Sequence, residues 1–136
     1  MPLMIKRMSV ALGAGVGVAL IDIWLSSASN PDAWDLNGPM FWYMFLNRVS
    51  IGFFVAIAGI VTIHPLLNFK MFPIRGAFVG VWISLSMAAS IFFEDSATWG
   101  TFWMIVLSGA VYGVLVDILA TKFAGQGKKL LHPSNA

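Results

Sequence analysis

The sequence predicts an all-α membrane protein in which four transmembrane helices pack as a compact bundle. Hydrophobic residues make up 59% of the 136 residues and charged residues only 10%, whereas charged residues make up roughly 25% of an ordinary soluble domain. The chain also contains four apolar stretches of about 20 residues or more, enough to cross a hydrocarbon core of roughly 30 Å. Most charged residues lie between these stretches.

The expected spans cover residues 8–29, 40–66, 74–93 and 99–123, within a single domain over residues 1–124. Segments that break helices separate them, such as Asn30-Pro31-Asp32 and Gly38-Pro39. From residue 125 to residue 136 the sequence is polar and basic, which predicts a flexible cytoplasmic tail.

The first stretch also has features of a cleavable signal peptide, because small residues at Ser26-Ser27-Ala28 follow a basic start and an apolar run. The apolar run continues past the roughly 7–15 residues typical of a signal. Asp22 and Trp24 would fall between the apolar core and the cleavage site, so a retained span is favoured.

The charges between the spans separate by sign. The basic set comprises Lys6, Arg7, Lys70, Arg75, Lys122, Lys128 and Lys129, and the acidic set comprises Asp32, Asp35, Glu94 and Asp95. A four-span layout puts these sets on opposite sides of the membrane. The positive-inside rule then places both termini in the cytoplasm.

Asn47 and Arg48 lie inside the second span. An arginine at the bilayer centre costs roughly 2.5–3.5 kcal/mol on insertion scales, so it needs an anion, a head group or a functional role. Arg48, Gly52, Ala56 and Gly59 follow one another at helical spacing, which predicts that Arg48 faces another helix and not lipid.

Every span carries such a stripe of small residues. The stripes comprise Ala11, Gly15 and Ala19 in the first span, Gly52, Ala56 and Gly59 in the second, Gly76, Gly80, Ser84 and Ala88 in the third, and Gly109 and Gly113 in the fourth. Small residues let helix backbones approach closely in a bilayer. The stripes therefore predict the interfaces of the bundle.

Two carboxylates continue these stripes, Asp22 after Ala19 and Asp117 after Gly113. Asp22 and Arg48 should both lie about 10–12 Å below the acidic side, so they could pair. With Asn47 and Tyr43, such a pair is either a polar site open toward the outer face or a structural ion pair that docks the first two helices. Asp117 is a weaker candidate, because it either snorkels to the interface or pairs with Lys70 or Arg75.

A weak internal repeat relates the second and fourth spans. Phe41-Trp42 precedes Gly52 by the interval that separates Phe102-Trp103 from Gly113. Either the four helices form two related hairpins, or the similarity arises by chance between two apolar segments.

Several chemistries are not expected. The chain has no cysteine and two histidines, which disfavours haem or a structural zinc site, and no cofactor or metal is predicted. It shows no phosphate-binding loop and no arrangement of nucleophile, base and acid, so an enzyme active site is not predicted. The net charge of +2 lies beside the spans and does not indicate nucleic-acid binding.

The string Asn47-Arg48-x-x-x-Gly52-Phe53, followed by Arg75-Gly76 and by Gly109-x-x-Tyr112-Gly113 with Asp117, resembles a group of small uncharacterised bacterial four-helix membrane proteins. The resemblance covers the second to fourth spans. It implies a bacterial inner-membrane protein, and it implies no activity.

Two functions follow as expectations. The first is an accessory or scaffold protein that binds partner membrane helices through its stripes of small residues. The second is a small channel or transporter that uses Asp22, Asn47 and Arg48, as a homo-oligomer or with a path between its repeats. The lipid bilayer is the expected surrounding in both cases, and no particular solute is predicted.

Overall fold

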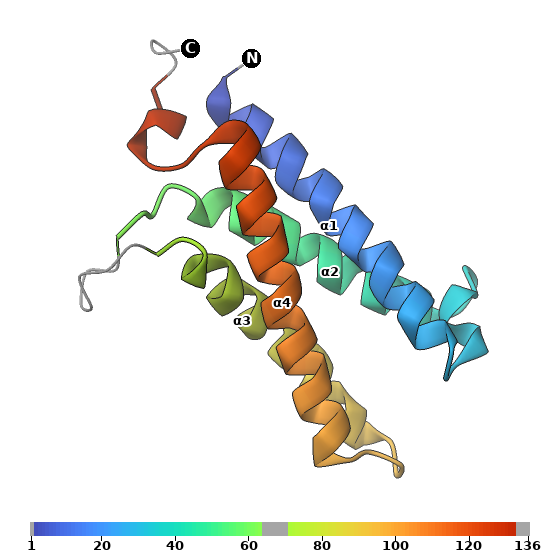
Figure 1. Ribbon diagram of the computed structural model, residues 1–136. Helices are drawn as coiled ribbons and strands as arrows, with labels where there is room; N and C mark the ends of the chain where they lie inside the picture. The colour runs from blue at the N-terminus through green and yellow to red at the C-terminus, as the bar shows by residue number, and fades with distance from the viewer. Residues whose placement is uncertain (1, 64–70, 133–136) are drawn as a thin grey trace.

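In a computed structural model, which describes residues 2–63 and 71–132, the chain folds into four long helices (Figure 1). These are α1 (Leu3–Ser27), α2 (Pro39–Ala58), α3 (Ile74–Ser90) and α4 (Trp99–Ala124). Short 3-10 helices follow three of them: η1 (Pro31–Trp34), η2 (Ile91–Phe93) and η3 (Lys128–Leu130). With η2 added to α3, all four are long and apolar enough to cross a membrane, so the predicted fold class is confirmed.

Local sequence explains where these helices begin and end. Gly38 precedes α2, and Pro39 occupies its first turn, where a missing N–H costs nothing. The Thr98 side chain accepts a hydrogen bond from the Thr101 N–H at 3.1 Å and caps α4. At the other end of α4, Gly125 has a φ of 78°, a conformation that favours glycine.

The second span is shorter than expected. The sequence predicted a helix to residue 66, but α2 ends at Ala58, and residues 64–66 lie outside the described residues. Residues 60–63 remain apolar, so hydropathy alone did not predict that α2 ends at Ala58. The chain leaves the helix where backbone carbonyls of Gly59 and Val61 turn to accept hydrogen bonds from Arg75.

Two other boundaries differ. α1 begins at Leu3 and not at residue 8, so Arg7 belongs to the helix. The expected flexible tail begins at residue 125, but in the structure the Gly127 N–H donates to the Gly59 carbonyl at 2.8 Å and Leu130 is buried. The first part of the tail therefore packs on the bundle, and residues 133–136 lie outside the described residues.

The helices pack as two hairpins, α1 with α2 and α3 with α4. Between α3 and α4 the backbones touch, since a Cβ built on Gly80 would collide with the carbonyl of Gly109, and one on Gly113 with that of Gly76. Between α1 and α2, a Cβ on Gly52 would collide with the carbonyl of Ala11. The predicted stripes thus form these interfaces, while the relation of the hairpins as repeats stays a prediction.

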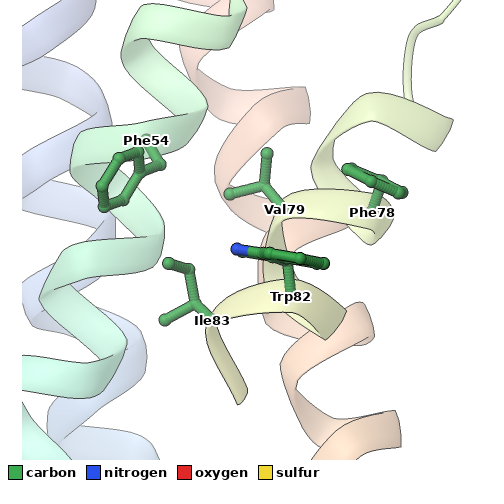
Figure 2. A pocket seen from close by; sticks show the side chains of 5 residues that line it. All are labelled: Phe54, Phe78, Val79, Trp82 and Ile83. Carbon is green, nitrogen blue, oxygen red and sulfur yellow. The ribbon is translucent and has the colours of Figure 1, made fainter. Parts of the chain in front are cut away.

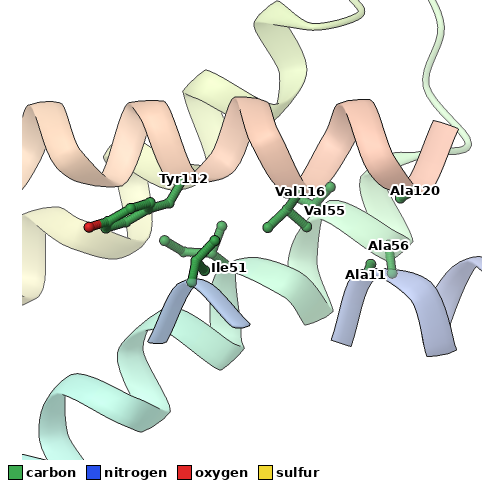
Figure 3. Packing of buried hydrophobic residues seen from close by; sticks show 8 residues of the cluster. Ala11, Ile51, Val55, Ala56, Tyr112, Val116 and Ala120 are labelled. Carbon is green, nitrogen blue, oxygen red and sulfur yellow. The ribbon is translucent and has the colours of Figure 1, made fainter. Parts of the chain in front are cut away.

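The hairpins lie close together at the end that holds both termini and diverge toward the other end (Figure 1). An apolar cluster from α1, α2 and α4 fills the space between them, comprising Ala11, Val18, Ile51, Val55, Ala56, Tyr112, Val116 and Ala120. Tyr112 lies at one end of this cluster, with its hydroxyl pointing away from Val116 and Ala120 (Figure 3). The tyrosine marks where the apolar core gives way to polar groups.

Candidate functional site

Arg48 lies at the centre of a polar cluster beyond this core. Its side chain is 1% exposed, and its Nε donates to Asp22 Oδ2 at 2.8 Å. The bond joins α2 to α1 between the two residues that the sequence placed at similar depth. Because the pair carries one charge of each sign, the cluster is neutral overall.

Two further hydrogen bonds of Arg48 reach the second hairpin. Nη1 donates to Ser84 Oγ on α3 at 2.7 Å, and Nη2 donates to Ser108 Oγ on α4 at 3.1 Å. The Tyr112 hydroxyl of α4 donates to Asp22 Oδ1 at 3.0 Å, and its ring centroid lies 5.1 Å from the guanidinium carbon of Arg48. One arginine thus contacts residues of all four helices.

Of the other two residues that the sequence added to this site, one joins it and one does not. Asn47 Oδ1 accepts from Arg48 Nη1 at 3.2 Å, while Asn47 Nδ2 donates to the Ile83 carbonyl on α3 at 3.1 Å. Tyr43 is exposed, and its hydroxyl bonds Ser90 Oγ at 3.0 Å, away from Arg48.

A cavity of about 350 Å³ lies against this cluster, and we call it the cleft. Asp22 and Arg48 form part of its wall, with contributions from all four helices. Leu25, Ser29 and Met104 at its edge are exposed, so the cleft opens where the hairpins diverge. The lining residues are Asp22, Leu25, Ser26, Ser29, Met44, Arg48, Met87, Met104, Ile105, Ser108 and Tyr112.

A second cluster closes the opposite end of the bundle around Asp117. Arg7 Nη2 donates to Asp117 Oδ1 at 2.7 Å, and Arg75 holds both carboxylate oxygens, from Nη2 to Oδ1 at 2.6 Å and from Nε to Oδ2 at 2.9 Å. All three side chains are at least 98% buried. The cluster joins α1, α3 and α4.

Two arginines and one aspartate leave one excess positive charge, and backbone carbonyls at the ends of helices balance it. Arg7 donates to the carbonyls of Val55 and Ala56 in the last turn of α2, each at 3.2 Å, and to that of Gly125 after α4 at 2.7 Å. Carbonyls at a helix C-terminus carry partial negative charge, so they stabilise a cation there. Arg75 adds Gln126 Oε1 at 3.0 Å and so ties down the segment after α4.

The sequence identified Asp117 but only part of this cluster. Arg75 is its partner, as one alternative proposed, and Lys70 lies outside the described residues. Arg7 was assigned to a basic cap outside the first span and is instead completely buried. A signal was present, because Arg7 precedes Ala11 and Gly15 by steps of four, the same spacing that singled out Arg48.

Three residues of the Arg48 cluster were not predicted as site residues. Ser84 had been placed in a stripe, where its hydroxyl also serves as an acceptor, and Ser108 precedes the stripe residue Gly109. Tyr112 is the one tyrosine within the fourth predicted span. A hydroxyl group in or next to a stripe of small residues could therefore have identified these three residues as members of the cluster.

A smaller cavity of about 160 Å³ lies between α2 and α3 and is lined by Phe54, Phe78, Val79, Trp82 and Ile83 (Figure 2). Among these side chains only the Trp82 indole carries a polar atom. The lining of this groove is otherwise apolar and holds no charged side chain among the described residues.

Within residues 2–63 and 71–132, no group of three or more His, Cys, Asp or Glu side chains could hold a metal ion. Comparisons with protein-family models, curated proteins and solved structures find no match to this chain.

Proposed function

We propose that the protein is a non-enzymatic membrane protein that binds a small solute in the cleft, as the binding step of a small transporter. The observation that carries this proposal is the position of the Asp22–Arg48 pair on the wall of the cavity of about 350 Å³. An ion pair that only docks two helices needs no cavity beside it. Small-molecule sites typically occupy roughly 300–1,000 Å³ and combine an apolar lining with a few polar groups.

The scaffold function has weaker support. It required stripes of small residues that are free to bind partner helices. Gly76, Gly80, Gly109 and Gly113 already contact one another between α3 and α4, and Gly52 contacts Ala11 between α1 and α2. Faces that are buried within one chain cannot also receive a partner unless the bundle opens.

Among the described residues, the exposed ones that line the cleft lie where the hairpins diverge. The apolar cluster and the Arg7–Asp117–Arg75 cluster fill the bundle on its other side. A continuous pore is therefore absent from the described part of the chain, and transport would require the hairpins to move relative to each other. Such rocking of one repeat against another is a common transport mechanism.

We further propose that the protein resides in a bacterial inner membrane with both termini in the cytoplasm and functions as a homo-oligomer. Arg7 and Arg75 are buried, but the exposed charges still separate by sign. Lys6, Lys122, Lys128 and Lys129 are exposed near the termini, and Asp32, Asp35, Glu94 and Asp95 are exposed in the segments at the other end. This pattern supports the orientation, and the cleft then opens to the outside.

Cysteine accessibility tests the proposal, and the chain has no native cysteine. Ser108→Cys places a thiol in the cleft, whereas Leu107→Cys places one on the exposed apolar surface at nearly the same depth. In bilayer nanodiscs, a charged methanethiosulfonate reagent should modify the cleft thiol and spare the lipid-facing one, because a thiolate forms only where water reaches it.

Ser26→Cys on α1 gives a second cleft position that does not bond Arg48. If neither cleft thiol reacts faster than the thiol at position 107, the space beside Asp22 and Arg48 is closed to water. The proposed solute site would then be wrong, and the ion pair would serve packing alone.

A further inference from the structure

The hydrogen bonds around Asp22 and Arg48 leave both a donor and acceptors unused. Arg48 has five N–H groups, and its bonds to Asp22, Asn47, Ser84 and Ser108 use four of them. The remaining group, on Nη2, has no partner among the described residues. The carboxylate of Asp22 receives one bond on each oxygen, from Arg48 and from Tyr112, and a carboxylate can accept about four.

Both side chains are at least 89% buried and both contact the cleft. An unused N–H donor and unused acceptor positions on a carboxylate therefore belong to neighbouring side chains in the wall of the cleft. The rest of its wall is largely apolar, with the thioethers of Met44, Met87 and Met104 and the hydroxyls of Ser26 and Ser29. This arrangement suits a ligand with one polar end and an apolar body.

The charge of the site selects among such ligands. Asp22 and Arg48 neutralise each other, and among the described residues they are the only charged ones in the lining. An added anion or cation would leave one uncompensated charge against a largely apolar wall, which costs more than binding an uncharged ligand there. A zwitterion would avoid this only by pulling the pair apart, with the loss of the 2.8 Å bond.

We propose that the cleft binds a small uncharged amphiphile whose polar end carries both a hydrogen-bond donor and an acceptor, such as a primary amide. The amide carbonyl accepts a hydrogen bond from the free N–H of Arg48, and the amide N–H donates one to the carboxylate of Asp22. The ion pair stays intact, and the apolar body packs against the methionines. This assignment rests on the proposed solute-binding function and specifies its ligand class.

Four six-carbon probes separate the alternatives: hexanamide, hexanoate, hexylammonium and 6-aminohexanoate. Isothermal titration calorimetry of the full chain in nanodiscs measures binding of each. A Met104→Trp variant, which narrows the exposed edge of the cleft, measures partition into lipid and serves as the blank. We expect hexanamide to bind at least about tenfold more tightly than either ion, because the ions suffer the desolvation cost.

A charge change provides the second measurement. Asp22→Asn leaves Arg48 uncompensated, so the site becomes cationic and its preference should shift by more than about tenfold toward hexanoate. Arg48→Gln makes the site anionic and should shift its preference toward hexylammonium. If either variant fails to fold, the four probes on the unaltered protein still decide the ligand class.

The outcomes distinguish the two proposals. Tightest binding of an ion or of 6-aminohexanoate, lost in Met104→Trp, would overturn the uncharged class and leave solute binding standing. Binding of none of the four probes above the blank would contradict both. Hexanamide binding that is equally strong in Met104→Trp would not arise from the cleft and would likewise refute the assignment.

Discussion

Arg7, Arg48 and Arg75 are among the largest side chains that the bundle buries completely, and each bonds to residues from other helices. Removing one partner of a buried ion pair costs more than the pair itself contributes, because the remaining charge has no counter-ion. The cost should be greatest at Asp117, where one carboxylate serves two arginines.

We therefore expect Asp117→Asn to lower the free energy of unfolding by about 3–5 kcal/mol. The exposed Asp95→Asn is the matched control and should change it by less than about 0.5 kcal/mol. Unfolding titrations with sodium dodecyl sulfate in mixed micelles measure both. Adding Arg7→Gln to Asp117→Asn should cost less than the sum of the single changes, and strict additivity would show that Arg7 and Asp117 do not interact.

The sequence predicted the Asp22–Arg48 pair and gave Arg75 as one possible partner of Asp117, but it did not predict that Arg7 meets Asp117. Asp22, Arg48 and Asp117 were identified because each continues a stripe of small residues at helical spacing. The partnership of Arg7 with Asp117 spans 110 positions and depends on how α1 crosses α4. No periodicity within a single helix contains that information.

At the scale of the helices, glycine decides how closely α3 and α4 approach. A Cβ on Gly80 would overlap the backbone of Gly109, and a backbone cannot move aside as a flexible side chain can. The same residue type serves no such purpose at Gly13 on α1, where a Cβ would meet nothing within 4 Å. Gly80 is therefore packed against another backbone, whereas Gly13 is open, and the two positions form a matched pair for the same substitution.

Gly80→Ala should force the two helices apart and lower the free energy of unfolding by about 1–3 kcal/mol. Gly13→Ala should leave it unchanged or raise it by up to about 1 kcal/mol, because alanine is the better helix former. Thermal unfolding in detergent, followed by circular dichroism, compares the two variants. Equal losses would mean that contact between the α3 and α4 backbones does not stabilise the fold.

Hydropathy predicted the number and type of helices well but placed the end of α2 poorly. Residues 60–63 are as apolar as a span, yet their segment leaves the helix and brings carbonyls to Arg75. Similarly, the polar composition after residue 125 predicted a flexible tail, whereas Gly127 and Leu130 pack on the bundle. Both differences arise from tertiary hydrogen bonds and burial that composition does not encode.

At the scale of the whole molecule, the two polar clusters divide the bundle into an end with a cleft and a closed end. Exposed acidic residues lie at the first end and exposed lysines at the second. If the positive-inside rule holds, a solute reaches Asp22 and Arg48 from outside the cell. Because the cleft opens at the acidic end, one labelling experiment tests both the orientation and the access of solute to the cleft.

The most direct test labels single cysteines in intact cells with a membrane-impermeant thiol reagent. Ser96→Cys reports the acidic end, Lys129→Cys the basic end and Ser26→Cys the cleft. We expect the thiols at positions 96 and 26 to react in intact cells and the thiol at 129 only after the cells are permeabilised. Reaction at 129 but not at 96 would reverse the orientation, and reaction at 96 without reaction at 26 would contradict a cleft that is open to the outside.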